Sequence, residues 1–208
     1  MKIFENRKEA GRELAKALMD YADRSDVFLY ALPRGGVTVA KEVAEELKLP
    51  LDVIITRKIG APYNEEYAIG ALAETGETVW NEAERMATDK KALDKIVRHE
   101  TGEASRRVKV YRQGRELPSF EDKTVIIVDD GIATGLTMLA GIEVARHMKA
   151  SKIVVAVPHG AKESIDAIRR QGIEVVALEE PEWYDAVGAF YKDFPQVTDQ
   201  EVLEMLKI

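Results

Sequence analysis

Two adjacent acids, followed closely by hydroxyl and glycine residues, are the part of the sequence best suited to chemistry. Asp129 and Asp130 end a run of apolar residues, and Thr134, Gly135 and Thr137 follow them. If a helix starts here, its first N–H groups lack partners within the helix and carry the positive end of the helix dipole. Gly135 lets the backbone approach a ligand, and the threonine hydroxyls add donors. The segment is therefore predicted to bind a phosphate.

The two acids serve a different part of the ligand. Two carboxylates would repel a phosphate, but they accept hydrogen bonds from a diol and can hold hydrated Mg²⁺. A diol beside a phosphate describes a ribose 5-phosphate. The competing interpretation is a solvated Asp-Asp turn before an ordinary helix, yet the pattern would arise by chance at only ~10⁻⁴ over a chain of this length. The functional interpretation is therefore preferred.

The segment from Val125 to Thr137 resembles the motif with which type I phosphoribosyltransferases bind 5-phosphoribosyl 1-diphosphate (PRPP). That motif is an apolar strand, two acids, a short loop and Thr-Gly-x-Thr. The resemblance implies that Asp129 and Asp130 are catalytic residues that hold the ribose hydroxyls and take part, directly or through water, in binding Mg²⁺. It also implies that the 5-phosphate is held by Gly131, Ile132, Ala133, Thr134, Gly135, Leu136 and Thr137.

A second loop takes its role from its place relative to this motif. Residues 33–36 follow the first predicted strand. Their two glycines let backbone N–H groups converge on an anion, and their arginine adds a forked donor. The segment is similar to the Arg-Gly-Gly loop of the bacterial xanthine-guanine enzymes. The resemblance implies a diphosphate-binding loop, often with a non-proline cis peptide, made of Pro33, Arg34, Gly35 and Gly36.

Two more pairs of residues are assigned by the same resemblance. Arg57 and Lys58 follow the second predicted strand, at the opening of the family's mobile loop, and are expected to face the diphosphate. Such a loop keeps water away from the activated anomeric carbon. Trp183 and Tyr184 stand where the family's hood binds the nucleobase, and their aromatic faces suit a planar heterocycle.

The acceptor base is not identified by these motifs. The 6-oxopurine enzymes of the family carry an acid inside the phosphate loop, where this chain has Ala133, so hypoxanthine, guanine and xanthine are disfavoured. The adenine enzymes share the Ala-Thr-Gly sequence of residues 133–135, but their hood and lid differ from the ones expected here. The whole chain most resembles phosphoribosyltransferases whose base is unassigned.

Strands and helices alternate around these motifs. The run Thr124–Val128 shows no polar alternation, which indicates a strand covered on both faces, as in a parallel sheet. The alternation predicts a doubly wound α/β domain, in which ligands bind beyond the carboxyl ends of the strands. The other predicted strands are 27–31, 51–55, 153–157 and 173–178, and the predicted helices include one capped by Asn6 and others at 136–149 and 161–170.

The remaining segments are expected to surround the site. We expect a single domain over residues 1–208, with its core at about 26–56 and 120–180. Residues 57–115 contain a hairpin signal around Thr75-Gly76-Glu77 and a long polar helix from about Asp89, and are interpreted as a lid or arm. The aromatic tail, residues 181–208, is interpreted as a small C-terminal hood.

Composition limits the class of protein. The 208 residues include 30 Lys and Arg against 37 Asp and Glu, a net charge of −7, which disfavours broad binding to nucleic acid. Absence of cysteine excludes disulfides, thiolate metal sites and a cysteine nucleophile. The expected protein is cytoplasmic, without a signal peptide or membrane span. The basic stretch from Arg85 to Arg115 is either a solvated helix face or a surface that steers a polyanionic substrate.

The expected function is Mg²⁺-dependent transfer of the 5-phosphoribosyl group from PRPP to a nitrogenous base, with release of diphosphate, in nucleotide metabolism. The alternative is a regulatory protein of the same fold that senses PRPP or nucleotides with little or no catalysis. A phosphoacceptor receiver domain is set aside, because receivers carry their acid pair after the first strand and have no use for Thr-Gly-x-Thr. Many relatives form dimers, so a homodimer is compatible with the resemblance.

Overall fold

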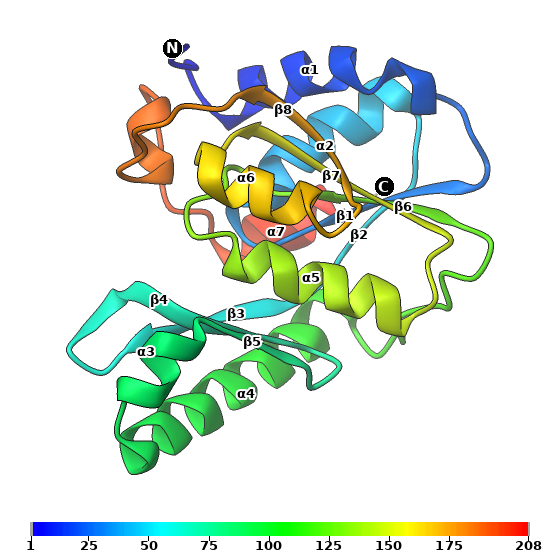
Figure 1. The fold of residues 1–208 in the computed structure, drawn as a ribbon. Coiled ribbons are helices and arrows are strands. Elements are labelled where there is room, and N and C mark those ends of the chain that lie inside the picture. The colour runs from blue at the N-terminus through cyan, green and yellow to red at the C-terminus, as the bar shows by residue number, and fades with distance from the viewer. Residues whose placement is uncertain (1, 208) are drawn as a thin grey trace.

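The computed structural model describes residues 2–207, and its centre is a five-stranded parallel sheet (Figure 1). The strands run in the order β2-β1-β6-β7-β8, and each neighbouring pair is parallel. β1 and β6 are neighbours although the chain between them is long, so the strand order reverses there. The predicted doubly wound α/β fold is confirmed. The strands are β1 (Val27–Ala31), β2 (Leu51–Val53), β6 (Thr124–Val128), β7 (Lys152–His159) and β8 (Glu174–Glu179).

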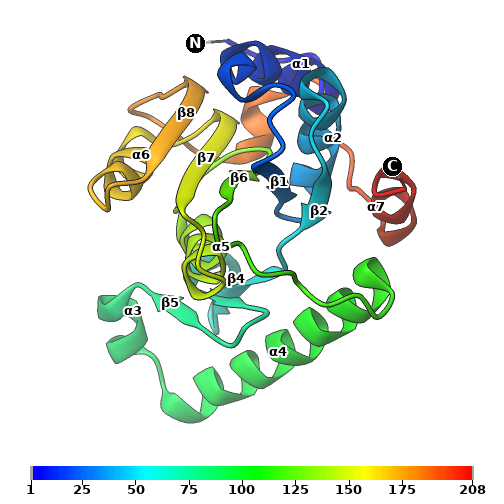
Figure 2. The ribbon, with the colours of Figure 1, turned by 90° about the vertical axis from the view of Figure 1, so that its right-hand side faces the viewer.

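The helices that cover the sheet are α1 (Arg7–Ala17), α2 (Gly35–Leu47), α5 (Leu136–His147) and α6 (Lys162–Arg169). α1 and α2 lie over one face, and α5 and α6 lie over the other (Figure 2). Successive residues of β6 therefore enter two cores. Ile126 and Val128 pack with α1 and α2, whereas Val125 and Ile127 pack with α5. This two-sided burial is the reason that the strand shows no polar alternation.

An arm lies beside the parallel sheet and below it in Figure 1. Its hairpin turn falls where the sequence predicted one, and Gly76 there has a φ of 100°, which a glycine adopts without a steric penalty. Asp89 caps the long helix, as its side chain accepts a hydrogen bond from the N–H of Ala92. The arm consists of β3 (Thr56–Ala61), β4 (Asn64–Ala73), β5 (Thr78–Trp80), α3 (Glu82–Ala87) and α4 (Lys90–Arg112), with the strands in one antiparallel sheet.

The region after the second strand differs from the prediction. β2 ends at Val53 rather than at residue 55, and Arg57 and Lys58 lie inside β3 rather than in a loop. β3 pairs with β4, with Thr56 opposite Ala73. β3 is held by pairing with the adjacent strand β4, while its own sequence contains two basic residues and Gly60 and lacks the uninterrupted apolar run of a buried strand.

The C-terminal residues return to the N-terminus. A short 3₁₀ helix, η2 (Val187–Phe190), precedes the helix α7 (Asp199–Met205). The N–H of Phe4 donates to the carbonyl of Phe190 at 2.9 Å, so the start of the chain is joined directly to the hood. Asn6 then caps α1, as predicted, by accepting from two backbone N–H groups. No helix within residues 2–207 is both long and apolar enough to cross a bilayer.

Candidate functional site

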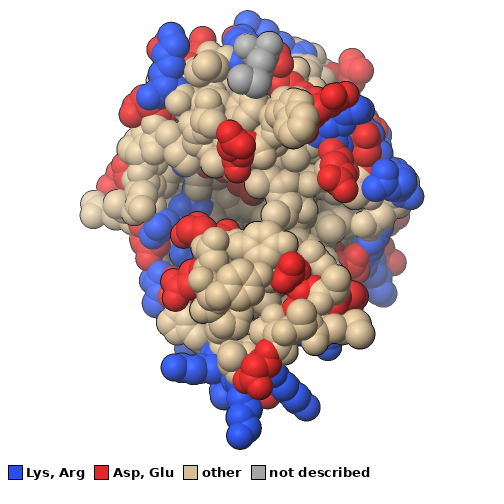
Figure 3. Space-filling model, turned by 60° about the vertical axis from the view of Figure 1, so that its left-hand side comes forward, with Lys and Arg blue, Asp and Glu red and all other residues tan. Residues whose placement is uncertain are grey.

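The two loops predicted to bind phosphate groups leave the sheet side by side. Ala31 at the end of β1 is the register partner of Val128 at the end of β6. Residues 33–36 and the acid pair therefore emerge at the reversal of strand order, where open α/β sheets bind ligands. On the side of the molecule that Figure 1 shows at the left, the surface is hollowed between the main body and the arm (Figure 3).

Close contact between these loops depends on two glycines. A Cβ atom on Gly36 would lie 2.9 Å from the Cα of Asp129, and one on Gly35 would lie 1.9 Å from Oδ2 of Asp130. Any side chain at either position would overlap the acids. The Arg-Gly-Gly sequence therefore lets the backbone lie directly against the carboxylates, in addition to its effect on local conformation.

The loop at residues 33–36 has the features of an anion-binding turn. The peptide bond between Pro33 and Arg34 is cis, the non-proline kind that the family resemblance implied. α2 begins at Gly35, so the N–H groups of the glycines belong to a helix start and have no acceptor within the helix. The Arg34 side chain faces Asp199 at the start of α7, with 3.6 Å between Nη1 and Oδ1.

Residues 131–137, the predicted phosphate loop, lead into α5 with the geometry expected of a phosphate-binding helix start. Gly135 has a φ of 77° and is the N-cap of the helix, with Leu139 donating to its carbonyl at 2.8 Å. Ala133 and Thr134 at the tip are exposed, so the loop is open to a ligand. Ser164 of α6, which the sequence gave no reason to select, donates to the carbonyl of Ala133 at 2.6 Å and fixes the tip.

The acid pair lies half-buried at the base of this loop. The N–H of Asp130 donates to Oδ1 of Asp129 at 2.8 Å, which orients the first carboxylate. Burial, together with the negative charge of Asp130, raises the pKa of Asp129 well above its ordinary value. Two adjacent carboxylates in a partly buried site gain from a nearby cation or from hydroxyl donors.

A buried arginine that the sequence analysis did not select forms a salt bridge with the second acid of the pair. Nε of Arg7, in the first turn of α1, donates to Oδ2 of Asp130 at 2.7 Å. The two residues are 123 positions apart, and a single arginine after a helix cap has no motif. The sequence therefore contained no usable signal for this contact.

Two tyrosines of the hood pack against the segment that carries the acid pair and against His159. The hydroxyl of Tyr191 donates to the carbonyl of Asp130 at 2.6 Å, and the hydroxyl of Tyr184 lies 2.8 Å from Nδ1 of His159. A Cβ on Gly131 would meet His159, Val187 and Tyr184 within 2.9 Å, so the hood packs directly on the start of the loop. Trp183 is 90% exposed, so it takes little part in this packing.

Arg57 and Lys58 are engaged within the arm. Arg57 forms an ion pair with Glu100 of α4 at 2.7 Å, and Lys58 pairs with Glu66 of β4 at 2.9 Å. The structure does not bring either side chain into contact with residues 33–36 or with the acid pair. Their assignment to the diphosphate stays a prediction.

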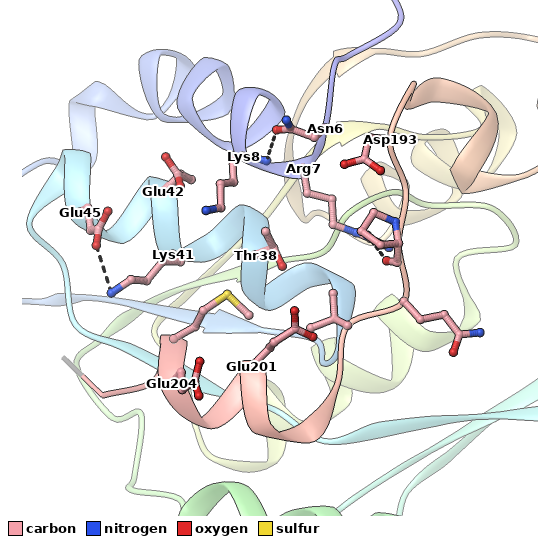
Figure 4. A pocket seen from close by; sticks show the side chains of 14 residues that line it. Asn6, Arg7, Lys8, Thr38, Lys41, Glu42, Glu45, Asp193, Glu201 and Glu204 are labelled. Atoms are coloured by element: carbon pink, nitrogen blue, oxygen red, sulfur yellow. Dashed lines mark hydrogen bonds and ion pairs between the residues drawn. The ribbon is translucent and has the colours of Figure 1, made fainter.

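A cavity of about 630 Å³ lies between α1, α2 and the C-terminal segment, outside the phosphate loops (Figure 4). Arg7 forms part of its wall, so this residue is shared between the cavity and the acid pair. The wall also carries charges of both signs, from Lys8, Lys41, Glu42, Glu45, Asp193, Glu201 and Glu204.

No cluster of three or more metal-ligating side chains occurs within residues 2–207. The acid pair nevertheless suits a cation that is shared with a substrate. Oδ1 of Asp129 and Oδ2 of Asp130 accept hydrogen bonds, so one oxygen of each carboxylate is left for another partner within the described part of the chain. Mg²⁺ is commonly held by one or two carboxylates together with substrate phosphates and water.

The fold and the two loops together define a phosphoribosyl transferase domain. The sequence profile of the phosphoribosyl transferase domain matches residues 2–194. The chain therefore belongs to this family, and the predicted type I phosphoribosyltransferase fold is confirmed.

Particular relatives share most or all of the chain. A crystal structure of a Thermus thermophilus protein is similar, with 39% identity and a TM-score of 0.78, covering 99% of this chain and 98% of that one. A Mycobacterium tuberculosis protein, provisionally named a phosphoribosyl transferase, is 42% identical over 99% of this chain. That match covers 47% of the relative, so the chain spans about half the length of the curated relatives it matches. A purine phosphoribosyltransferase from Pyrococcus horikoshii shares the fold, with 18% identity, a TM-score of 0.51 and 92% coverage of both chains.

Proposed function

We propose that this domain transfers the 5-phosphoribosyl group of PRPP to a nitrogenous base and releases diphosphate. The observation that carries the proposal is the meeting of three features at the β1–β6 reversal: the acid pair, the glycine loop at residues 33–36 and the helix start at Gly135. A diol, a diphosphate and a 5-phosphate on one ribose need such groups side by side.

Each group has a task in the reaction. The N–H groups at the start of α5 and the Thr134 and Thr137 hydroxyls bind the 5-phosphate, which anchors the sugar. Asp129 and Asp130 accept hydrogen bonds from the ribose hydroxyls and favour the positive charge that develops when the anomeric bond breaks. The N–H groups of residues 35 and 36, with Arg34, bind the departing diphosphate. The base nitrogen then bonds to the anomeric carbon.

Mg²⁺ belongs to the proposal as the partner of the acid pair. The two unengaged carboxylate oxygens of Asp129 and Asp130 are the groups that would hold it. When bound, it would neutralise charge on the diphosphate. Arg34 must leave Asp199 to turn fully toward the same leaving group, and the 3.6 Å separation is consistent with a contact that breaks easily.

The acceptor is proposed to enter beneath the hood. Tyr184 lies against Gly131 at the start of the loop, where a ring attached to the anomeric carbon would come close. Trp183 is exposed at the hood surface, and its assignment to the base stays a prediction. The acceptor class proposed is a planar nitrogen heterocycle, because aromatic side chains bind such rings by stacking.

Calorimetry of PRPP with Mg²⁺ tests the site. The double variant Asp129→Asn/Asp130→Asn should lose measurable binding while its circular dichroism is unchanged, because neutral amides neither attract the cation nor favour positive charge on the sugar. Glu121→Gln/Asp122→Asn is a matched control, as this exposed acid pair precedes the same strand at its opposite end. Equal affinity for all three proteins would refute the assignment.

A turnover assay separates an enzyme from a sensor. The protein is incubated with PRPP, Mg²⁺ and a panel of free purine and pyrimidine bases, and diphosphate release is followed. An enzyme should release diphosphate with at least one base and not with base omitted. Binding of PRPP without release for any base would favour the sensing alternative instead.

A further inference from the structure

Arg7 stands out among the charged residues because it is buried against the site from a distant part of the chain. Its side chain is 9% exposed, and Nε lies 2.7 Å from Oδ2 of Asp130. Nη1 donates to the carbonyl of Pro195 at 2.8 Å, and the guanidinium lies 3.6 Å from the ring centroid of Phe194. One side chain therefore connects α1, the acid pair and the hood.

The position of Arg7 is fixed by the packing of its helix. Asn6 caps α1 immediately before it. One turn further, Gly11 lies against α2, where a Cβ would come within 2.6 Å of the carbonyl of Val39. α1 can therefore seat closely on α2, which itself starts at the diphosphate loop. At that start, a Cβ on Gly35 would be 3.0 Å from Nε of Arg7, so a side chain at this position would crowd the arginine.

The contact between Arg7 and Asp130 is the source of positive charge beside the acid pair. Within residues 2–207, the salt bridge with Arg7 is the one ion pair made by either acid. A carboxylate that is partly buried beside another carboxylate is unfavourable without a cation or donors. Arg7 supplies a cation and a donor to Asp130, and its hydrogen bond is to Oδ2 alone. The bond sets which face of the carboxylate a ribose would meet.

We propose that Arg7 is a positioning residue for the ribose: it orients Asp130 toward the sugar hydroxyls and fastens the hood segment at Pro195 to the same point. This inference rests on the proposed function and adds the first turn of α1 to the site. The inference predicts different effects of an Arg7 substitution on two ligands. Loss of Arg7 should impair recognition of the sugar, which Asp130 serves, more than recognition of diphosphate, which the backbone of residues 35 and 36 serves.

The test compares two probes by calorimetry in the presence of Mg²⁺, ribose 5-phosphate and inorganic diphosphate. In Arg7→Gln, affinity for ribose 5-phosphate should fall about ten- to hundredfold, the scale of one charge-assisted hydrogen bond. Affinity for diphosphate should stay within about twofold, since backbone donors remain. Arg7→Lys keeps the charge and one donor direction, so it should recover part of the loss.

Arg12→Gln is the matched control. Arg12 lies on the same helix, pairs with Glu42 at 2.8 Å and is largely exposed, so its loss should change neither affinity. Equal loss of both ligands in Arg7→Gln, or no loss of either, would overturn the inference, because both outcomes indicate that Arg7 does not act through the sugar. Wild-type protein that binds neither probe would instead overturn the proposed function itself. If Arg7→Gln fails to fold, Arg7→Lys provides the same comparison of ligands.

Discussion

His159, at the end of β7, is enclosed by the aromatic side chains of the hood. It is fully buried, and its ring stacks on Phe190 with 4.4 Å between centroids. Nδ1 is paired with the Tyr184 hydroxyl, while Nε2 is buried without a hydrogen-bond partner in the described structure. Burial lowers the pKa of His159 to about 4. The imidazole therefore stays neutral over the physiological range and serves packing rather than charge.

This lowered pKa predicts a pH dependence of stability. An unfolded histidine takes up its proton near pH 6.5, whereas the folded one does so near pH 4, so the unfolded state binds more protons between these values. The free energy of unfolding should therefore fall as the pH drops from about 6.5 to 4, by up to about 3 kcal/mol. In His159→Gln, which does not titrate, urea unfolding should show a shallower decline over that range. Equal slopes for the two proteins would contradict the assignment.

At the residue scale, site residues could be predicted from the sequence where they lie close together in one continuous motif. Asp129, Asp130, Gly135 and the threonines near them lie in one continuous motif at a strand-to-helix junction, and the structure places them together. Arg7 meets Asp130 only because α1 packs on α2 and the chain returns to the hood. A contact between residues so far apart in the sequence leaves no spacing to recognise.

At the scale of secondary structure elements, the arm is held to the sheet by a buried ion pair. Arg112 at the end of α4 is paired with Glu74, which follows β4, and the two side chains are 2% and 6% exposed. Arg112 also donates to the carbonyl of Val53 at the end of β2, at 2.6 Å. Glu74 in turn accepts from the N–H of Ile55 at 2.7 Å. The pair thus joins the arm to the core where the chain leaves the parallel sheet.

Removing one partner of this pair should be costly. Arg112→Met leaves the Glu74 carboxylate buried without its cation, and should lower the free energy of unfolding by about 3–5 kcal/mol. The double variant Arg112→Met/Glu74→Leu removes both charges and should recover a large part of that loss. Urea denaturation of the wild type and both variants measures this. A double variant as unstable as the single one would show that the charges are not the cause.

The elements that the sequence predicted well are those whose residues carry their own pattern. β1 and β6 were predicted with their observed bounds, because uninterrupted apolar runs are distinctive. α4 was predicted as a long polar helix from about Asp89, and the structure shows that Asp89 is its N-cap. β3 was missed because it exists through pairing with β4 and its sequence contains Arg57, Lys58 and Gly60. Whether the arm acts as a mobile lid stays a prediction.

At the scale of the whole molecule, charge is unevenly distributed. The chain carries a net charge of −7, yet Lys and Arg gather at the lower end of the arm, away from the hollow (Figure 3). Within the basic stretch from Arg85 to Arg115, several arginines are paired with acids, including Arg106 with Asp199 and Arg107 with Glu103. The remaining lysines near the start of α4 are exposed. This arrangement favours the solvated helix face over a surface that steers the substrate.

The triple variant Lys90→Gln/Lys91→Gln/Lys95→Gln tests that conclusion. Lys90 precedes Arg106 by 16 residues in one helix, which is about 24 Å along the axis. Arg106 pairs with Asp199, the residue that faces Arg34, so the start of α4 is separated from this contact by more than the ~8 Å screening length at physiological salt. The KM for PRPP should change by less than about twofold, because the screened field at the site is small. A rise of fivefold or more that disappears as salt is added would show instead that the arm steers the substrate to the hollow.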